Sequence, residues 1–348
     1  MVKEITADEL ASHSKDATIV DVRSPNEYHQ GHIPGAINLP LFSDGERELI
    51  GTIYHHHGRD EAFNKGLELA GSKLSAYIRE IRNCAVNDKL LVYCWRGGMR
   101  SESLSRLFSV SGFNVGRLTG GYKAFRKYAK QFFDCRFRFI VIGGMTGTGK
   151  TGLLKQIGKS GRQVIDLEAT ANHKGSVFGH LGKSAQPTNE QFENELFFRL
   201  NKMDKELPVW IEDESRNIGS NMMPLNLFDN ILCSPLILLE LSIDKRIIRL
   251  VNEYAGYDTP ELLKPLSKIS KRLGSLNTGL AREAIINNEF GRAADIILHH
   301  YDKTYSLSVN KRNPETVFRL TLENDDAAGN AALVLEFARQ KGILNFEF

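Results

Sequence analysis

Residues 137–151 read FRFIVIGGMTGTGKT, an apolar strand pattern that runs directly into a glycine-rich loop. The loop has the spacing Gly-x4-Gly-Lys-Thr of the P-loop, in which backbone N–H groups wrap phosphates, the lysine reaches the terminal phosphates and the threonine can bind Mg²⁺. The residues that fill these phosphate-binding roles are Gly144, Gly147, Gly149, Lys150 and Thr151. The motif therefore predicts a parallel α/β domain that binds a diphosphate or a triphosphate.

The chain beyond this motif keeps alternating between strand and helix patterns. Strands are expected at 137–142, 163–167, 209–212 and 236–241, and helices at 262–273, 281–288 and 327–340. Such alternation is typical of a parallel sheet covered by helices. We therefore expect residues 133–348 to form a P-loop NTPase-like α/β domain with C-terminal helices.

A second α/β pattern precedes the P-loop domain. Strands are expected at 18–22, 90–94 and 115–118, helices at 101–110 and from about 121 to 132, and a mostly helical insertion at about 44–81. The basic segment 127–138 then looks like the joint between two domains. Residues 1–132 are therefore predicted to form a separate domain built on its own parallel sheet.

A cysteine ends the expected strand at 90–94 and enters a loop of glycine and arginine. Residues 94–101 read CWRGGMRS, so Cys94 precedes Arg96, two glycines and Arg100. A thiol is a nucleophile only as the thiolate, which nearby positive charge and the N–H groups of a helix N-terminus stabilise. The loop therefore predicts a reactive Cys94, with Arg96 and Arg100 as anion-binding partners, in preference to a cysteine that only fills the core.

Polar residues follow the strands of the P-loop domain, where ligands bind in parallel α/β folds. The candidates for substrate contact are Asp166, His173, Asp213, Glu214 and Arg216. Asp213 or Glu214 stands where a Mg²⁺-holding carboxylate is expected beside a P-loop, although a solvated acidic turn is the alternative. A single loop histidine such as His173 is often structural, so that interpretation also stays open.

The composition sets the remaining limits. The chain has 348 residues, a net charge of +3 and four cysteines that lie far apart. This length allows two domains, and the mild charge permits a polyanionic partner without requiring one. No apolar run approaches the roughly 20 residues that span a bilayer, and the N-terminus lacks a signal-peptide pattern. We therefore expect a cytoplasmic protein that does not engage a membrane and has no disulfide framework.

The N-terminal domain resembles the rhodanese family. The resemblance rests on residues 21–28 (DVRSPNEY), 31–38 (GHIPGAIN), the Cys94 loop and 118–122 (LTGGY). It implies a rhodanese-like fold in which the loop cysteine carries sulfur as a persulfide. One departure is that five residues separate Cys94 from Arg100, where sulfurtransferases usually have four. Cys-dependent phosphatases share the longer spacing, which fits a tetrahedral oxyanion such as phosphate.

The whole chain resembles the tRNA 2-selenouridine synthase family. Besides the two loops, the resemblance rests on residues 166–179 (DLEATANHKGSVFG), 186–187 (QP) and 212–219 (EDESRNIG). It implies that 2-thiouridine at the wobble position of tRNA is converted to 2-selenouridine, with selenophosphate as donor and S-geranylation from geranyl diphosphate as an intermediate step. Cys94 would then carry selenium as a selenylsulfide, and the P-loop would hold the diphosphate of geranyl diphosphate.

The same resemblance sets expectations for ligands and partners. Selenophosphate and geranyl diphosphate would be substrates, so no tightly bound cofactor is expected, while Mg²⁺ is a candidate ion at the P-loop. The donor would be delivered by selenophosphate synthetase, and tRNA would be the macromolecular partner. Basic residues recur at helical spacing at Lys264, Lys268, Lys271 and Arg272, and they would suit a phosphate backbone as well as they suit a solvated helix face.

Rival functions remain open on the residues alone. One is an ATP-dependent sulfurtransferase or kinase acting on RNA, which would use the P-loop for a nucleotide. Another is a Cys-dependent phosphatase that uses Cys94 and Arg100, although Tyr93 stands where such enzymes often have histidine and no general-acid aspartate is evident in the loop. A non-catalytic RNA-binding scaffold is disfavoured because both loops keep their reactive residues.

Overall fold

A computed structural model describes residues 2–13 and 16–345 of the chain. These residues separate into two compact units. The first contains the chain up to Phe132 together with Glu193–Asn201, and the second contains Phe133–Phe192 and Lys202 onward. The segment Glu193–Asn201 was expected in the P-loop domain. It clusters with the first unit because the ring of Phe197 lies 5.1 Å from that of Phe132.

The first unit is built on a five-stranded sheet with the order β1-β5-β4-β2-β3, in which every pairing is parallel. Its strands are β1 (Lys3–Ile5), β2 (Thr18–Asp21), β3 (Ile37–Asn38), β4 (Lys89–Tyr93) and β5 (Asn114–Leu118). Its helices include α1 (Ala7–His13), α2 (Pro25–Gln30), α6 (Met99–Val110) and α7 (Gly121–Phe132). Val20, Val92 and Phe108 belong to the apolar core, so β2 and β4 lie at the centre of the unit.

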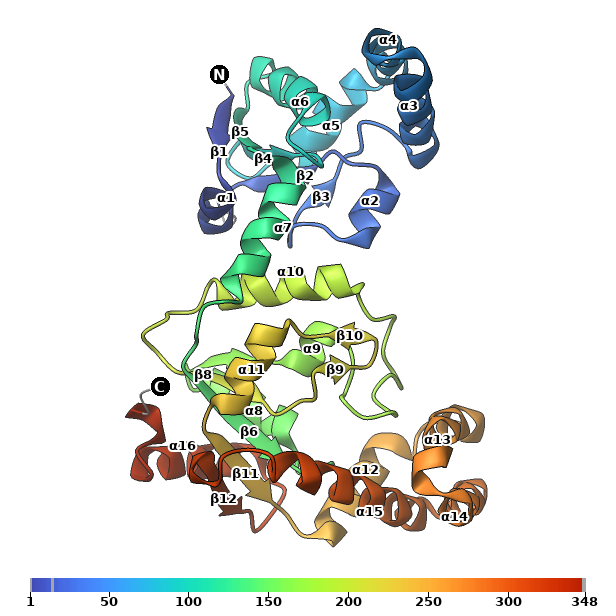
Figure 1. Ribbon diagram of the computed structural model, residues 1–348, viewed down its shortest axis with the longest axis vertical. Coiled ribbons are helices and arrows are strands. Elements are labelled where there is room, and N and C mark those ends of the chain that lie inside the picture. The colour runs from blue at the N-terminus through green and yellow to red at the C-terminus, as the bar shows by residue number, and fades with distance from the viewer. Residues whose placement is uncertain (1, 14–15, 346–348) are drawn as a thin grey trace. The chain divides into compact units, whose positions relative to one another are not determined.

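Three helices lie between β3 and β4, in the region where the sequence predicted a helical insertion. They are α3 (Asp44–His57), α4 (Arg59–Gly71) and α5 (Leu74–Cys84). α3 begins with a capping box, because the hydroxyl of Ser43 and the carboxylate of Glu46 each bond the other residue's backbone N–H. Figure 1 shows α3 and α4 side by side, while α5 buries Tyr77 and Ile81 in the core of the unit.

The second unit contains another five-stranded parallel sheet, with the order β12-β11-β6-β8-β7. The strands are β6 (Phe139–Gly144), β7 (Gln163–Ile165), β8 (Val209–Glu212), β11 (Leu236–Glu240) and β12 (Val317–Thr321). Every residue of the central strand β6 is buried. α8 (Lys150–Lys159) and α16 (Ala327–Gln340) pack together on the sheet through Leu154 and Val334. Both sheets are parallel, which confirms the predicted α/β class.

The second unit contains further helices and a short antiparallel pair besides its five-stranded sheet. Four helices share a separate apolar core and lie together in Figure 1: α12 (Ile243–Tyr254), α13 (Thr259–Leu273), α14 (Ser275–Ile286) and α15 (Phe290–Val309). The others are α9 (Leu167–Ala171), α11 (Leu225–Cys233) and the antiparallel pair β9 (Asn217–Ile218) and β10 (Asn221–Met222). α10 (Asn189–Leu200) begins in the second unit, but from Glu193 onward it belongs to the first. Across the described part of the chain, no helix is both long enough and apolar enough to cross a bilayer.

Candidate functional site

The cysteine loop joins β4 to α6 and is clamped against the start of α7. The N–H of Tyr122 donates to the carbonyl of Cys94 at 2.8 Å, and the N–H of Lys123 donates to the carbonyl of Trp95 at 3.0 Å. Gly121 has a φ of +60°, and a Cβ there would overlap the carbonyl oxygen of Cys94 and the nitrogen of Gly97. Glycine at this position therefore lets two backbone segments approach closely.

The Cys94 thiol lies inside this loop and is 3% exposed. Its sulfur is 3.2 Å from the hydroxyl oxygen of Ser101 and 3.8 Å from the carbonyl oxygen of Gly98. Ser101 is fully buried in the first turn of α6, and its hydroxyl also lies 3.1 Å from the Gly98 carbonyl. A hydroxyl in this place can donate to a thiolate, so Ser101 is a candidate positioning residue that sequence reasoning missed.

The two predicted arginine partners of the loop have different surroundings. Arg100 is half-buried and forms a two-pronged ion pair with Glu27, with distances of 2.6 and 3.2 Å. Burial alone would raise the pKa of Glu27, but the Arg100 guanidinium more than offsets this and holds that pKa below its ordinary value. Arg96 is exposed to solvent. Arg100 is therefore oriented by an acid on α2, whereas Arg96 is available to a ligand at the loop.

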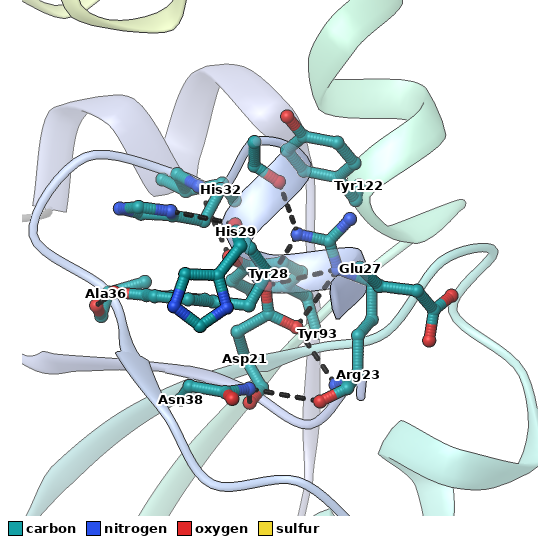
Figure 2. Close-up of polar contacts among 12 residues, drawn as sticks. Asp21, Arg23, Glu27, Tyr28, His29, His32, Ala36, Asn38, Tyr93 and Tyr122 are labelled. Atoms are coloured by element: carbon teal, nitrogen blue, oxygen red, sulfur yellow. Dashed lines mark hydrogen bonds and ion pairs between the residues drawn. The ribbon is translucent and has the colours of Figure 1, made fainter. Parts of the chain in front are cut away.

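A buried ion pair supports the strand ends beside the loop (Figure 2). The Arg23 guanidinium is 1% exposed and binds both carboxylate oxygens of Asp21, while its Nη2 donates to the Gly31 carbonyl at 2.6 Å. Its Cζ lies 3.9 Å from the centre of the Tyr122 ring. The Tyr93 hydroxyl accepts a hydrogen bond from the Ile33 N–H, and burial raises the pKa of this phenol. These contacts fix the ends of β2 and β4.

The P-loop joins β6 to α8 in the second unit. Gly147 and Gly149 have φ values of +87° and +82°, which explains the glycines at these two positions. The ammonium group of Lys150 donates to the Gly144 carbonyl at 2.9 Å across the loop. The Thr151 hydroxyl donates to Glu168 Oε2 at 2.8 Å. The predicted phosphate-binding residues therefore come together in one loop, and Glu168 is an additional carboxylate at its threonine.

Three glutamates gather near this loop. Glu212 is fully buried and accepts a hydrogen bond from the Glu168 N–H at 2.7 Å. Its Oε2 has no hydrogen-bond partner among the described residues. Burial, reinforced by the neighbouring carboxylates, raises the pKa of Glu212 well above its ordinary value, and burial also raises that of Glu168. For Glu214, burial raises the pKa to about 8 although Lys150 opposes the shift. Glu214 is therefore mostly uncharged at neutral pH.

The other predicted substrate contacts have structural partners. Both carboxylate oxygens of Asp213 are engaged, one by Arg312 at 2.6 Å and one by the Tyr305 hydroxyl at 2.7 Å. Asp166 caps α9 by accepting from the Ala169 N–H at 2.7 Å. Arg216 donates from Nε to the Met223 carbonyl at 3.2 Å. Of the two carboxylates proposed from the sequence for Mg²⁺, Glu214 therefore has fewer competing partners than Asp213.

His173 follows α9 and is 6% exposed. A Cβ placed on Gly179 or Gly219 would lie within 2.9 Å of its imidazole ring, so the ring is enclosed by two glycines. Its Nδ1 lacks a partner among the described residues, and burial lowers the pKa of the ring. The ring is therefore predominantly neutral at neutral pH, and its burial favours the structural interpretation.

Two arginines of α12 approach the P-loop, and sequence reasoning missed both. Arg246 donates to the Thr146 carbonyl at 3.2 Å and forms an ion pair with Asp302 at 2.6 Å. The Arg249 guanidinium bonds Asp325 and lies 2.6 Å from where a Cβ on Gly149 would be. Their only sequence signal is their place in an amphipathic helix, about a hundred residues after the motif. The loop therefore has cationic neighbours besides Lys150.

The two units match two known families. Residues 6–128 match the family described as a rhodanese-like domain, and residues 137–330 match the tRNA 2-selenouridine synthase AAA domain. The chain therefore combines a rhodanese-like domain with a domain of the kind described for tRNA 2-selenouridine synthases. No three His, Cys, Asp or Glu side chains within residues 2–13 and 16–345 form a metal-binding group.

Curated relatives agree over nearly the whole length. The tRNA 2-selenouridine synthase of Pseudomonas fluorescens (strain Pf0-1) is 33% identical, over 94% of this chain and 95% of the relative. That of Pseudomonas savastanoi pv. phaseolicola (strain 1448A / Race 6) is 31% identical, over 97% and 98%. The crystal structure of the N-terminal domain of a putative ATP/GTP binding protein from Clostridium difficile 630 is 41% identical, over 37% of this chain and 98% of that one, with a TM-score of 0.33. The chain belongs to the tRNA 2-selenouridine synthase family, which confirms the resemblance found in the sequence.

Proposed function

We propose that this protein modifies tRNA by converting 2-thiouridine at the wobble position to 2-selenouridine, with selenophosphate as donor and S-geranyl-2-thiouridine as intermediate. The observation that carries this proposal is the pairing of a buried thiol loop and a P-loop in a chain that matches a synthase of that name over 94% of its length. Each loop suits a different phosphorus-containing substrate. The proposal therefore assigns one step of the conversion to each loop.

The P-loop step is S-alkylation. The thiouridine sulfur attacks the first carbon of geranyl diphosphate, the C–O bond to the diphosphate breaks and the base loses its N3 proton. Backbone N–H groups of the loop and the Lys150 ammonium would bind the diphosphate and stabilise its negative charge as it leaves. Arg246 and Arg249 place guanidinium groups beside the same loop, each of them also paired with an aspartate. Protonated Glu214 would not repel the anion at neutral pH.

The residues at the P-loop also suit a Mg²⁺ ion held together with the diphosphate. The Thr151 hydroxyl and the Glu168 carboxylate meet at 2.8 Å, and the buried Glu212 carries an unpartnered oxygen near them among the described residues. Mg²⁺ is commonly bound by one or two protein groups plus substrate phosphates. Such an ion would neutralise charge on the leaving diphosphate.

The cysteine loop would serve the selenium step. Its five-residue spacing between Cys94 and Arg100 suits a tetrahedral anion such as selenophosphate. The Ser101 hydroxyl lies 3.2 Å from the sulfur and would stabilise the thiolate. The selenium of the bound selenophosphate attacks C2 of the S-geranyl nucleoside, and the C–S bond breaks to release geranyl thiolate, which takes up a proton. Water then attacks phosphorus, the P–Se bond breaks, and phosphate leaves 2-selenouridine behind. S-Geranylation favours the attack at C2 because it removes the negative charge from the departing sulfur.

The test is mass analysis of tRNA nucleosides after incubation with 2-thiouridine tRNA, geranyl diphosphate and selenophosphate. We expect wild-type protein to form 2-selenouridine, Cys94→Ala to stop at S-geranyl-2-thiouridine, and Lys150→Ala to leave 2-thiouridine unchanged. Nucleosides unchanged by wild-type protein would refute the proposal. Geranylation that survives in Lys150→Ala but is lost in Cys94→Ala would reverse the assignment of the two loops.

A nucleotide-driven sulfurtransferase or kinase is the second candidate, because a P-loop flanked by Arg246 and Arg249 also suits a triphosphate. ATP turnover that requires Lys150 and rises with added tRNA would favour this function. If wild-type protein turned over ATP no faster than Lys150→Ala, this function would be excluded.

A further inference from the structure

An apolar cavity of about 80 Å³ lies beside the P-loop in the second unit. Thr146 of the loop forms part of its wall, and α12, α14 and α15 supply most of the rest. Its wall includes Leu250, Tyr254, Phe290, Ala294 and Tyr301. Apolar groups dominate this lining, so the cavity suits a hydrocarbon rather than a sugar or a base.

Thr146 connects the cavity wall to the phosphate loop. The carbonyl of Thr146 accepts a hydrogen bond from Arg246, which comes from the same helix as Leu250 and Tyr254. Gly147 follows directly and lies against the backbone of Arg246. A ligand that filled the cavity would therefore have one end at the residues that bind phosphate. This arrangement matches a molecule with an anionic head and an apolar tail.

Aromatic rings form part of the cavity wall, from Phe178, Tyr254 and Tyr301. The rings of Phe178 and Tyr254 lie 6.1 Å apart, and the Tyr301 hydroxyl accepts from the Val177 N–H at 3.3 Å, which holds this segment against α15. Burial raises the pKa of Tyr254 and of Tyr301, so both phenols stay neutral. Neutral aromatic faces attract cationic carbon, which develops where an allylic C–O bond breaks.

We propose that this cavity binds the tail of the prenyl diphosphate and selects its length. The inference rests on the proposed function, which places the diphosphate at the P-loop. A water-sized sphere requires roughly 10–15 Å³ of such volume, so the cavity has room for about six of them. That space suits a short prenyl chain of two isoprene units better than a longer one. The alkylated carbon would lie at the cavity mouth beside Thr146.

The experiment measures binding by calorimetry without tRNA. The ligands are inorganic diphosphate, geranyl S-thiolodiphosphate, which resists hydrolysis, and its farnesyl counterpart. Each buried methylene strengthens binding roughly fourfold, so the geranyl compound should bind wild-type protein about 50-fold or more tightly than diphosphate. The farnesyl compound should bind more weakly than the geranyl compound.

Three variants test the position of the tail. Ala294→Phe fills the cavity and should reduce geranyl affinity to within about threefold of diphosphate. Lys303→Phe introduces the same ring on an exposed part of α15 outside the cavity and should change nothing. Phe290→Ala widens the cavity and should make farnesyl affinity equal to or greater than geranyl affinity. Unchanged diphosphate affinity in each variant shows that the fold and the P-loop are intact.

The outcomes separate this inference from the proposed function. Diphosphate that binds in a Lys150-dependent manner, with no gain from the geranyl tail, would overturn the cavity assignment alone. The cavity assignment would also be overturned if Ala294→Phe still bound the geranyl compound much more tightly than diphosphate and Phe290→Ala still preferred geranyl to farnesyl. Failure of wild-type protein to bind any diphosphate would refute the proposed function at its first step.

Discussion

The Tyr305 hydroxyl donates a hydrogen bond to Asp213 at 2.7 Å and accepts one from the N–H of Gly144 at 2.9 Å. Arg312 binds the other oxygen of Asp213 at 2.6 Å. The first residue of the P-loop is therefore linked through one phenol to the end of β8 and to α15. Both carboxylate oxygens of Asp213 are therefore engaged by side chains, and the Tyr305 hydroxyl connects one of them to the start of the loop.

We expect Tyr305→Phe to weaken the P-loop without disturbing the cysteine loop. The Gly144 N–H is buried and would lose its partner, which costs about 1–3 kcal/mol. Chemical denaturation should show this loss in the free energy of unfolding, and calorimetry should show weaker diphosphate binding. Tyr54→Phe, at an exposed tyrosine, is the control and should leave both unchanged. Diphosphate affinity equal to wild type would show that the hydroxyl does not support the loop.

Ser101→Ala should slow the reaction of Cys94 with iodoacetamide at neutral pH. The Ser101 hydroxyl lies 3.2 Å from the sulfur and can donate to its anion. A hydrogen bond to a charged group contributes about 1.5–3 kcal/mol, so a decrease of roughly 10- to 150-fold is expected. The rate is measured by mass spectrometry at Cys94, and Ser101→Thr, which keeps a hydroxyl, should restore most of it. An undiminished rate in Ser101→Ala would mean that the hydroxyl bonds only the Gly98 carbonyl.

Glu214 should make stability fall as the pH rises. The pKa of this carboxyl is raised from 4.5 to about 8, so between these values the folded protein keeps a proton that the unfolded chain has lost. The free energy of unfolding therefore decreases with rising pH across this window. Glu214→Gln removes this titration. The free energy of unfolding of the variant, relative to that of wild type, should therefore increase between about pH 4.5 and pH 8. Denaturation at several pH values checks this, and parallel profiles for the two proteins would contradict it.

The close approach at Gly121 predicts a severe effect of an added methyl group. Gly121→Ala places a Cβ against the Cys94 carbonyl and the Gly97 nitrogen, both of which are backbone atoms that cannot move independently. We expect a loss of more than about 2 kcal/mol of stability and a disordered cysteine loop. Gly112→Ala is the matched control, since Gly112 also has a positive φ but has open space around it. Equal losses in the two variants would show that backbone strain alone is responsible.

Local patterns predicted much of the fold. The strand expected at 209–212 and the helix expected at 327–340 have the same bounds in the structure, because each is a self-contained apolar or amphipathic segment. β12 was missed because its residues are half-buried or exposed and give no continuous apolar run. α12 and α15 were also missed, although α12 has a clear helical spacing of apolar residues at Ile243, Ile247, Leu250 and Val251.

In the candidate sites, too, the sequence predicted local motifs but not the residues that contact them from distant segments. Cysteine and phosphate motifs are local, so the sequence was sufficient to find the Cys94 loop and the P-loop. The partners Glu27, Arg246 and Tyr305 come from segments that are 73, 100 and 161 residues away from the groups they contact. A single sequence carries no signal for such pairs. The commitment of Asp213 to Arg312 was hidden for the same reason, since their separation is 99 residues.

The buried pair of Asp21 and Arg23 has an evolutionary consequence. Removing one partner alone would strand the other charge in a site without water, which is strongly destabilising, whereas replacing both by apolar residues can be nearly neutral. Arg23 also bonds the Gly31 carbonyl and covers the Tyr122 ring, so its replacement must refill that space. Positions 21 and 23 should therefore change together among homologues, and an alignment of the family should record them as a co-varying pair.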